Sequence, residues 1–213
     1  MPFWSYILTA LAAYLLGSIP TGYLVAKARG IDIRAAGSGN IGATNAMRVL
    51  GKPAGIFVLL LDALKGYAAA GWLPLLAMHI FKVPNAENVA ILAGIFAVLG
   101  HNYTCWLKFK GGKGIATTAG VYLALAPWAL LAALVVFMLA VLLTRYVSVG
   151  SIAAAIAVSA AVWILPPHDL LLGIVTTALG ALAVYKHKSN IQRLMNRTEN
   201  RLGKKPQPSE KMK

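Results

Sequence analysis

Acidic side chains are scarce in this sequence, whose 213 residues include only 6 Asp and Glu against 20 Lys and Arg. Charged residues make up 12% of the chain and hydrophobic residues 59%, and the mean hydropathy is +0.70. This composition excludes an ordinary soluble globular domain, in which about a quarter of the residues are charged. It indicates an integral membrane protein.

Cysteine is nearly absent as well, and Cys105 alone permits neither an intrachain disulfide nor a Cys-rich metal framework. The sequence also contains no H-E-x-x-H motif, no set of paired carboxylates and no Ser-His-Asp signature. We therefore expect no metal and no other cofactor. The net charge of +14 does not indicate a nucleic-acid partner, because the basic residues form short clusters between long apolar runs.

Long apolar segments dominate what is present. Seven segments can be marked, each to within a few residues at its ends: 3–26, 53–81, 88–107, 114–127, 128–144, 148–165 and 169–185. Because a span needs about 20 apolar residues, the fourth segment is short, and six spans with one re-entrant piece are the alternative to seven. The first segment lacks the basic region that opens a secretory signal peptide, so we expect it to remain as a membrane span.

Lys and Arg are distributed unevenly between these segments. If the spans alternate, 18 of the 20 Lys and Arg fall on one side of the membrane, while Lys82 falls on the other and Lys65 lies within the second segment. Because basic loops stay in the cytoplasm, we expect the N-terminus outside and the C-terminus in the cytoplasm. We expect an all-α membrane domain over 1–197 with seven transmembrane helices, and a disordered basic cytoplasmic tail over 198–213.

Three regions on the basic side combine glycines, small polar side chains and a cation, which are the groups that suit a phosphate. The first, GSGNIGATNAMR (37–48), has the G-x-G-x-x-G spacing of a dinucleotide-binding turn, but no strand precedes it, so that function is excluded. An ordinary polar turn is the alternative. Its candidate phosphate-binding residues are Gly37, Ser38, Gly39, Asn40, Thr44, Asn45 and Arg48.

The second region, KFKGGKGIATT (108–118), departs from the P-loop pattern at two positions. Its glycines still predict an anion-binding nest around Lys113, although the preference for basic residues in cytoplasmic loops is sufficient to explain Lys108 and Lys110. The third, AVYKHKSNIQRL (183–194), places two polar residues three apart on one helix face, and an interfacial basic helix is its alternative. These two regions and the nearby third span add the candidates Gly111, Gly112, Lys113, Gly114, His187, Asn190 and His101.

Asp62 and Lys65 lie within the second apolar segment, three residues apart. Ionisable groups at such a depth are costly and usually face the interior of a bundle. We expect these two side chains to pair with each other.

The motifs GSGNxGATN, GH, FKGGKGxAT and KHxxNIQR, in this order on a chain with several spans, resemble those of the bacterial acyl-phosphate:glycerol-3-phosphate acyltransferase family. The resemblance covers nearly the whole chain except the tail, and one departure is Thr104, where the family commonly has proline. It implies a seven-span enzyme of the bacterial cytoplasmic membrane, with its active site on the cytoplasmic side. It also implies transfer of a fatty acyl group from acyl phosphate to the 1-hydroxyl of glycerol 3-phosphate, giving lysophosphatidate and inorganic phosphate in the first acylation of phospholipid synthesis.

The same resemblance assigns substrate binding and catalysis to Ser38, Arg48, Lys113, Ser151, His187 and Asn190, with Ser148 as an alternative to Ser151. We expect Ser38, Lys113, His187 and Asn190 to be catalytic, and the remaining candidates to bind substrate. We expect the protein to be a monomer surrounded by membrane lipids.

An acyl phosphate is already activated, so we expect direct attack by the glycerol hydroxyl and no covalent enzyme intermediate. Lys113 and loop N–H groups are expected to stabilise the developing negative charge. The proton is expected to pass to His187 or to a substrate phosphate. Since both substrates carry phosphate, few carboxylates are expected at the site, and only Asp32 and Asp62 are available on that side.

A small transporter for a phosphorylated anion is the rival interpretation. Its weakness is that the polar motifs gather on one face instead of at mid-membrane. The acyl-CoA-dependent acyltransferases with H-x-x-x-x-D are excluded, because Trp106 stands five residues after His101 and Pro84 stands five residues after His79.

Overall fold

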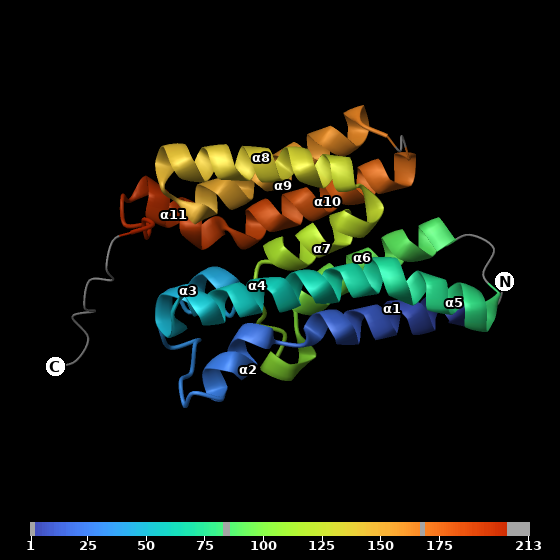
Figure 1. Cartoon of the computed structure of the whole chain (residues 1–213), viewed down its shortest axis with the longest axis horizontal. Coiled ribbons are helices and arrows are strands. Elements are labelled where there is room, and N and C mark those ends of the chain that lie inside the picture. Colours follow the sequence, from blue (N-terminus) through green and yellow to red (C-terminus); the bar gives the residue numbers. More distant parts are fainter. Residues whose placement is uncertain (1–2, 83–85, 167–168, 204–213) are drawn as a thin grey trace.

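The structure is a computed structural model that describes residues 3–82, 86–166 and 169–203. Within these ranges the chain forms helices and loops and contains no strand. The helices lie along one common axis, with the start of α1 at one end of the bundle and α11 at the other (Figure 1). In chain order they are α1 (Phe3–Ser18), α2 (Thr21–Lys27), α3 (Ala43–Leu50), α4 (Lys52–Tyr67), a π-helical turn η1 (Ala68–Trp72), α5 (Leu73–Phe81), α6 (Ala86–Asn102), a 3-10 turn η2 (Cys105–Leu107), α7 (Ile115–Leu125), α8 (Pro127–Thr144), α9 (Val147–Ile164), α10 (Leu170–Lys186) and α11 (Lys188–Met195).

The long helices follow the predicted apolar segments closely, but the first segment is broken between Ser18 and Thr21, and α3 and α11 lie outside the seven segments. Among the described residues, five stretches are long and apolar enough to cross a membrane, or six if α10 and α11, which meet at a bend of 51°, count as one. The five are Phe3–Lys27, Lys52–Phe81, Ala86–Leu107, Pro127–Thr144 and Val147–Ile164. The chain is therefore all-helical with five or six candidate spans, and α7, at 11 residues, is as short as its sequence indicated.

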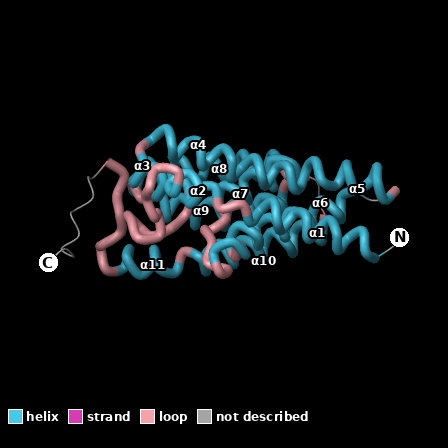
Figure 2. The backbone as a smooth tube through the Cα atoms, turned by 90° about the horizontal axis from the view of Figure 1, so that it is seen from below, coloured by secondary structure: helices cyan, strands magenta, loops and turns pink. Residues whose placement is uncertain are grey.

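The bundle has two groups of helices, with α8, α9 and α10 along the top of Figure 1 and α1, α4 and α5 along the bottom. A hydrophobic cluster that includes Ile91, Tyr122, Leu130, Val158 and Leu172 packs α6 and α7 against α8, α9 and α10. Most of the loop backbone gathers at one end of the bundle, beside α2, α3 and α11 (Figure 2). The three sequence regions predicted to bind phosphate lie at this end.

Glycines allow α4 and α7 to approach each other backbone to backbone. A Cβ atom added to Gly66 would lie 2.0 Å from the carbonyl oxygen of Thr117, and one added to Gly120 would lie 1.8 Å from that of Ala63. Lipid tails are as apolar as helix surfaces, so close van der Waals packing takes the place of the hydrophobic effect in holding such helices together. The same device joins α1 to α6 at Gly17 and Gly100.

Asp62 and Lys65 form the buried ion pair that their spacing predicts. The carboxylate and ammonium groups are 2.9 Å apart, and the two side chains are 2% and 6% exposed. Because each charge compensates the other, the pair is tolerated in an otherwise apolar helix. Removal of one partner would leave the other as an unpaired buried charge.

The break between α1 and α2 is held by two side chains that are distant in sequence, one from α4 and one from the loop after α6. Pro20 has no backbone N–H and the helix stops at Ser18, so carbonyl groups at this point lose their helical partners. The ammonium of Lys65 donates to the carbonyl of Ile19 at 2.9 Å, and the hydroxyl of Thr104 donates to that of Ser18 at 2.6 Å. Thr104, the departure from the family pattern, therefore ties the end of α6 to α1.

The close contact of α4 and α7 makes a first prediction. We expect Gly120→Ala to lower the thermal unfolding midpoint of the detergent-solubilised protein by several degrees, because overpacking a tight contact costs about 1–3 kcal/mol. Gly71→Ala is the matched control, since the nearest atom to its added Cβ would lie at an ordinary 3.5 Å. Equal midpoints for the two variants would contradict the contact.

Candidate active site

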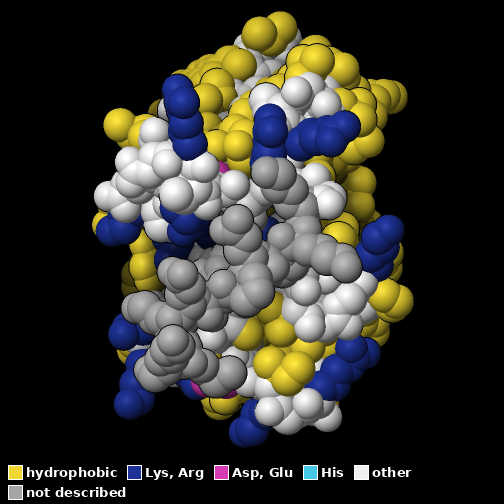
Figure 3. All heavy atoms as spheres, turned by 90° about the vertical axis from the view of Figure 1, so that its left-hand side faces the viewer, with side chains coloured by type: hydrophobic (Ala, Val, Ile, Leu, Met, Phe, Trp, Pro, Cys, Tyr) yellow, Lys and Arg dark blue, Asp and Glu magenta, His cyan; other side chains and the backbone are white. Residues whose placement is uncertain are grey.

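A cavity of about 160 Å³ lies at the loop-rich end of the bundle. It brings together eleven of the predicted site residues, which come from the three distant regions and from α6 and α9: Ser38, Asn40, Thr44, Asn45, Arg48, His101, Lys113, Gly114, Ser151, His187 and Asn190. Lys and Arg side chains are spread over this face of the molecule (Figure 3). Gly37, Gly39, Gly111 and Gly112 are not part of the cavity wall.

Asn45, at the start of α3, holds the first loop in shape. Its side chain is 2% exposed, and its Oδ1 atom accepts a hydrogen bond of 2.8 Å from the backbone N–H of Ser38. Its Nδ2 atom donates to the carbonyls of Ala36 and Asn40 at 3.0 and 2.8 Å. Asn45 thus positions Ser38 at the cavity wall.

Gly37 and Gly39 shape the same loop instead of contacting the cavity. Both have left-handed backbone angles, with φ of +60° and +71°, and a Cβ on Gly37 would lie 2.3 Å from the Asn45 side chain. A larger residue would therefore disturb both the turn and its anchor. The structure gives these two glycines a conformational role in the loop, and their direct phosphate binding stays a prediction.

Arg48 contributes a cation to the cavity from α3. Burial lowers the pKa of Arg48 from its ordinary value, but a guanidinium remains charged at any physiological pH. Its planar, forked donors match the oxygen atoms of a phosphate.

Gly111 and Gly112 press the second loop against the end of α6. Their N–H groups donate to the carbonyls of Asn102 and His101 at 3.2 and 3.0 Å, so these N–H groups are not free to bind an anion. A Cβ on Gly112 would lie 2.1 Å from Nε2 of His101. The predicted anion nest is therefore replaced, at these two glycines, by a contact that fixes the backbone next to Lys113.

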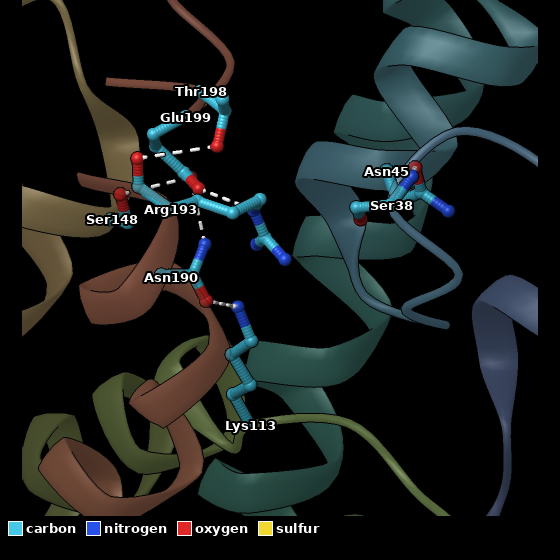
Figure 4. Close-up of polar contacts among 8 residues, drawn as sticks. All are labelled: Ser38, Asn45, Lys113, Ser148, Asn190, Arg193, Thr198 and Glu199. Atoms are coloured by element: carbon cyan, nitrogen blue, oxygen red, sulfur yellow. Dashed lines mark hydrogen bonds and ion pairs between the residues drawn. The ribbon is translucent and has the colours of Figure 1, made fainter. Parts of the chain in front are cut away.

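Lys113 lies between the second and third regions. Its ammonium group donates to Oδ1 of Asn190 on α11, 77 residues later in the chain (Figure 4). Burial, together with the nearby charges of Arg193 and Arg48, lowers the pKa of Lys113 to about 8, and Glu199 opposes this shift. The cavity therefore contains a lysine that loses its charge near pH 8.

His187 lies at the junction of α10 and α11, and it is 2% exposed. Its Nδ1 atom is 2.7 Å from the carbonyl oxygen of Ala183. A carbonyl oxygen only accepts hydrogen bonds, so Nδ1 carries a proton, and Nε2 of the neutral ring is an acceptor. The ring can therefore accept a hydrogen bond from a substrate hydroxyl through Nε2.

Sequence reasoning missed Glu199, whose carboxylate lines the cavity. We expected only Asp32 and Asp62 to supply carboxylates on this side, and Glu199 corrects that expectation. The disordered tail over 198–213 stays a prediction, since residues 204–213 lie outside the described residues. Glu199 accepts hydrogen bonds from Ser148, Asn190 and Arg193. Asp32 instead pairs with Arg34 at the surface. The signal in the sequence is an acidic residue shortly after the basic stretch from Lys186 to Arg197.

Ser148 and Ser151 both line the cavity from the first turns of α9, so the two alternatives for the predicted serine lie side by side. The hydroxyl of Ser148 donates a hydrogen bond of 3.0 Å to the carboxylate of Glu199.

Within the described residues, no group of three or more His, Cys, Asp or Glu side chains is arranged to hold a metal ion.

An apolar cavity of about 220 Å³ adjoins the polar one. It runs between α7, α8, α9 and α10, and five residues border both cavities: Leu59, Ile115, Ala116, Phe137 and Ser151. Along α9 it extends from Ser151 to Val158, which is about 10 Å at the helical rise of about 1.5 Å per residue. The two cavities together suit an amphiphile with an anionic head and an aliphatic chain.

Comparisons with known proteins agree with this geometry. The family model described as glycerol-3-phosphate acyltransferase matches residues 7–197. Relatives named glycerol-3-phosphate acyltransferase include those of Geotalea daltonii, 46% identical over 196 residues (92% of this chain and 97% of the relative), and Geobacter sulfurreducens, 48% identical over 195 residues (92% and 96%).

A crystal structure of PlsY (YgiH), an integral membrane glycerol 3-phosphate acyltransferase, in its glycerol 3-phosphate form is similar to this chain with a TM-score of 0.84 and 39% identity, covering 93% of this chain and 96% of that one. Its lysophosphatidic acid form gives a TM-score of 0.81, with the same identity and coverage. Since identity and coverage are high, the likeness extends over nearly the whole bundle.

The pKa of Lys113 leads to a second prediction, which concerns the pH dependence of phosphate binding. We expect the affinity of the purified protein for inorganic phosphate to fall about fivefold between pH 8 and pH 9, because Lys113 is positively charged below its pKa and loses that charge above it. The measurement is the phosphate-dependent shift of the thermal unfolding midpoint at each pH. Lys113→Arg, which stays charged, should remove this fall, and an unchanged fall would assign it to another group.

Proposed function

Because the chain belongs to the glycerol-3-phosphate acyltransferase family and is an integral membrane enzyme, we propose that it transfers a fatty acyl group from an acyl phosphate to the 1-hydroxyl of glycerol 3-phosphate. The products are lysophosphatidate and inorganic phosphate, as in the first acylation of phospholipid synthesis. The names of the solved relatives, one in a glycerol 3-phosphate form and one in a lysophosphatidic acid form, support both ends of this reaction.

The observation that carries the proposal is the junction of the cationic cavity with the apolar one. An acyl phosphate has an anionic head and a long aliphatic chain, and its reactive carbonyl lies where the two meet. Ile115, Phe137 and Ser151 border both cavities at that place. A transporter for a small phosphorylated anion would have no use for the apolar cavity.

The cations of the cavity supply the electrostatic part of the mechanism. Arg48 and Lys113 hold the phosphate groups, and Lys113 also stabilises the charge that develops as the phosphate leaves. Ser38 and Asn190 position the substrates at the cavity wall, so that most of the rate enhancement comes from orientation and charge.

The bond changes need no covalent enzyme intermediate. The 1-hydroxyl oxygen of glycerol 3-phosphate attacks the acyl carbon, an ester bond forms, and the bond between that carbon and the phosphate oxygen breaks. The hydroxyl proton passes either to Nε2 of His187, since Nδ1 already donates to Ala183, or to an oxygen of a substrate phosphate.

The membrane arrangement that we propose has seven crossings, with the cavity on the cytoplasmic side of the bacterial inner membrane. The opposite positions of the start of α1 and of α11 support an odd number of crossings (Figure 1). The gathering of Lys and Arg on the face with the cavity supports its cytoplasmic side (Figure 3). The cavity is built within one chain, which supports a monomer as the active unit.

A direct assay tests the proposed reaction. Purified protein with palmitoyl phosphate and labelled glycerol 3-phosphate should form labelled lysophosphatidate and one phosphate per turnover. Lys113→Ala should lower kcat by about 10²–10³-fold, as loss of a preorganised charge does. Lys108→Ala, which removes an exposed cation of the same loop outside the cavity, should not. Uptake of glycerol 3-phosphate into liposomes without product would favour the transporter instead.

The apolar cavity makes a separate prediction. We expect Ala154→Leu, whose larger side chain would fill part of this cavity, to lower kcat/KM for palmitoyl phosphate by about tenfold or more and to leave that for butanoyl phosphate nearly unchanged. Ala160→Leu, on the exposed side of the same helix, is the control. An equal effect on both donors would mean that the acyl chain binds elsewhere.

A further inference from the structure

Residues 198–203, which we call the C-terminal strap, connect the end of α11 to the start of α9. The backbone N–H of Leu202 donates to the carbonyl of Arg145 at 2.8 Å. The guanidinium of Arg201 lies over the ring of Tyr146, 5.2 Å from its centre. The strap is therefore attached at points that are independent of the cavity, and it holds Glu199 between them and α11.

The carboxylate of Glu199 is almost completely enclosed, and its side chain is 6% exposed. It accepts hydrogen bonds of 2.7 Å from Nδ2 of Asn190, 2.6 Å from Nε of Arg193 and 3.0 Å from the hydroxyl of Ser148 (Figure 4). A buried carboxylate is costly unless such donors surround it. In a cavity suited to phosphates it also repels the ligand, so its presence requires an explanation.

The explanation lies in the amide of Asn190, which stands between Glu199 and Lys113. A carboxylate only accepts hydrogen bonds and an ammonium only donates them. One orientation of the amide satisfies both neighbours, with Nδ2 toward Glu199 and Oδ1 toward Lys113. Without the carboxylate, the amide would be free to turn, and Lys113 would lose its fixed acceptor.

We propose that Glu199 is a positioning residue for the acyl transfer, acting through Asn190 to fix the ammonium group of Lys113 at the cavity. This inference rests on the proposed function, because it concerns the cation assigned to the substrate phosphate. Glu199 also pairs with Arg193, which leaves Arg48 and Lys113 to the substrates.

Glu199 also acts on Lys113 through its charge, because it stabilises the protonated form of that lysine. Arg48 on α3, Lys186 on α10 and Arg193 on α11 all disfavour a protonated Lys113, and the neighbouring His187 is neutral in its acceptor form. Glu199 is the carboxylate that opposes them. Burial raises the pKa of Glu199, but hydrogen bonds from Asn190 and Arg193 outweigh it and leave that pKa below its ordinary value, so the group is ionised at neutral pH.

The competing interpretation is that Glu199 occupies the place of a substrate phosphate and hinders binding. The two interpretations predict opposite changes on removal of its charge. A positioning residue supports turnover, whereas an occupant of the phosphate site competes with the substrate.

The test compares Glu199→Gln with Arg201→Ala in the full-length chain. Glu199→Gln keeps the side-chain length but cannot accept from both Asn190 and Arg193 as the carboxylate does. We expect kcat to fall about tenfold and the alkaline limb of the pH profile of kcat/KM to move down by about one pH unit, because an opposite charge is lost near Lys113. Arg201→Ala loosens the strap but keeps the carboxylate, and it should leave the alkaline limb unchanged.

A second variant and a second measurement keep the outcome clear. Glu199→Asp retains the charge but not the reach, so it should lower kcat and keep the wild-type alkaline limb. The pH dependence of Lys113 acetylation by isotope-labelled acetic anhydride, followed by mass spectrometry, reports the charge of Lys113 without any assay of turnover. Its midpoint should fall in Glu199→Gln and stay constant in Arg201→Ala.

Two results would overturn the positioning role. A lower KM for glycerol 3-phosphate with a higher kcat/KM in Glu199→Gln would identify Glu199 as an occupant of the phosphate site. Glu199→Gln and Arg201→Ala could instead lose activity and thermal stability in parallel, with no change in the alkaline limb or in the acetylation midpoint. That result would show that the strap has only a structural role. If the wild-type protein forms no lysophosphatidate, the proposed function fails by itself, and the acetylation midpoints still decide the role of Glu199 toward Lys113.

Discussion

Backbone contact at glycine residues is the constraint on which the rest of this structure depends. A membrane bundle gains little from burying apolar surface between its helices, so its stability rests on close packing. Gly66 and Gly120 supply it between α4 and α7. The same device acts outside the spans, where Gly111 and Gly112 bring the second loop against α6. The position of Lys113 is thus a consequence of how tightly a loop packs on the end of a helix.

Charges near the cavity are compensated in pairs, because each described carboxylate there has a cation as its partner. Asp62 pairs with Lys65, and Glu199 pairs with Arg193. Within the described residues, no carboxylate pairs with Arg48 or Lys113, although both are partly buried. A partly buried cation without an anion is unfavourable in the empty enzyme, and a bound phosphate relieves that cost. The unpaired cations therefore select an anionic ligand.

The sequence predicted most of the fold and much of the cavity, because both depend on local patterns. Apolar segments show in the hydropathy of the chain, and a loop that mixes glycines with a cation is recognisable wherever it folds. The role of Gly112 was not predictable in the same way, since it depends on which atoms of His101 lie opposite. Glu199 was missed for a similar reason: the composition of 198–213 indicates disorder, and the hydrogen bonds that hold one carboxylate in place come from distant helices.

The short fourth segment, which looked like an irregularity in the sequence, is explained by the position of its first residue. α7 has 11 residues and is about 16 Å long, roughly half the thickness of the hydrocarbon core. α7 begins at Ile115, which borders both cavities. Its N-terminal N–H groups and the positive end of its dipole therefore lie beside Lys113. In the proposed seven-span arrangement α7 is the fourth crossing, and a longer helix would move that positive charge away from the acyl carbonyl, so the shortness of α7 serves the chemistry.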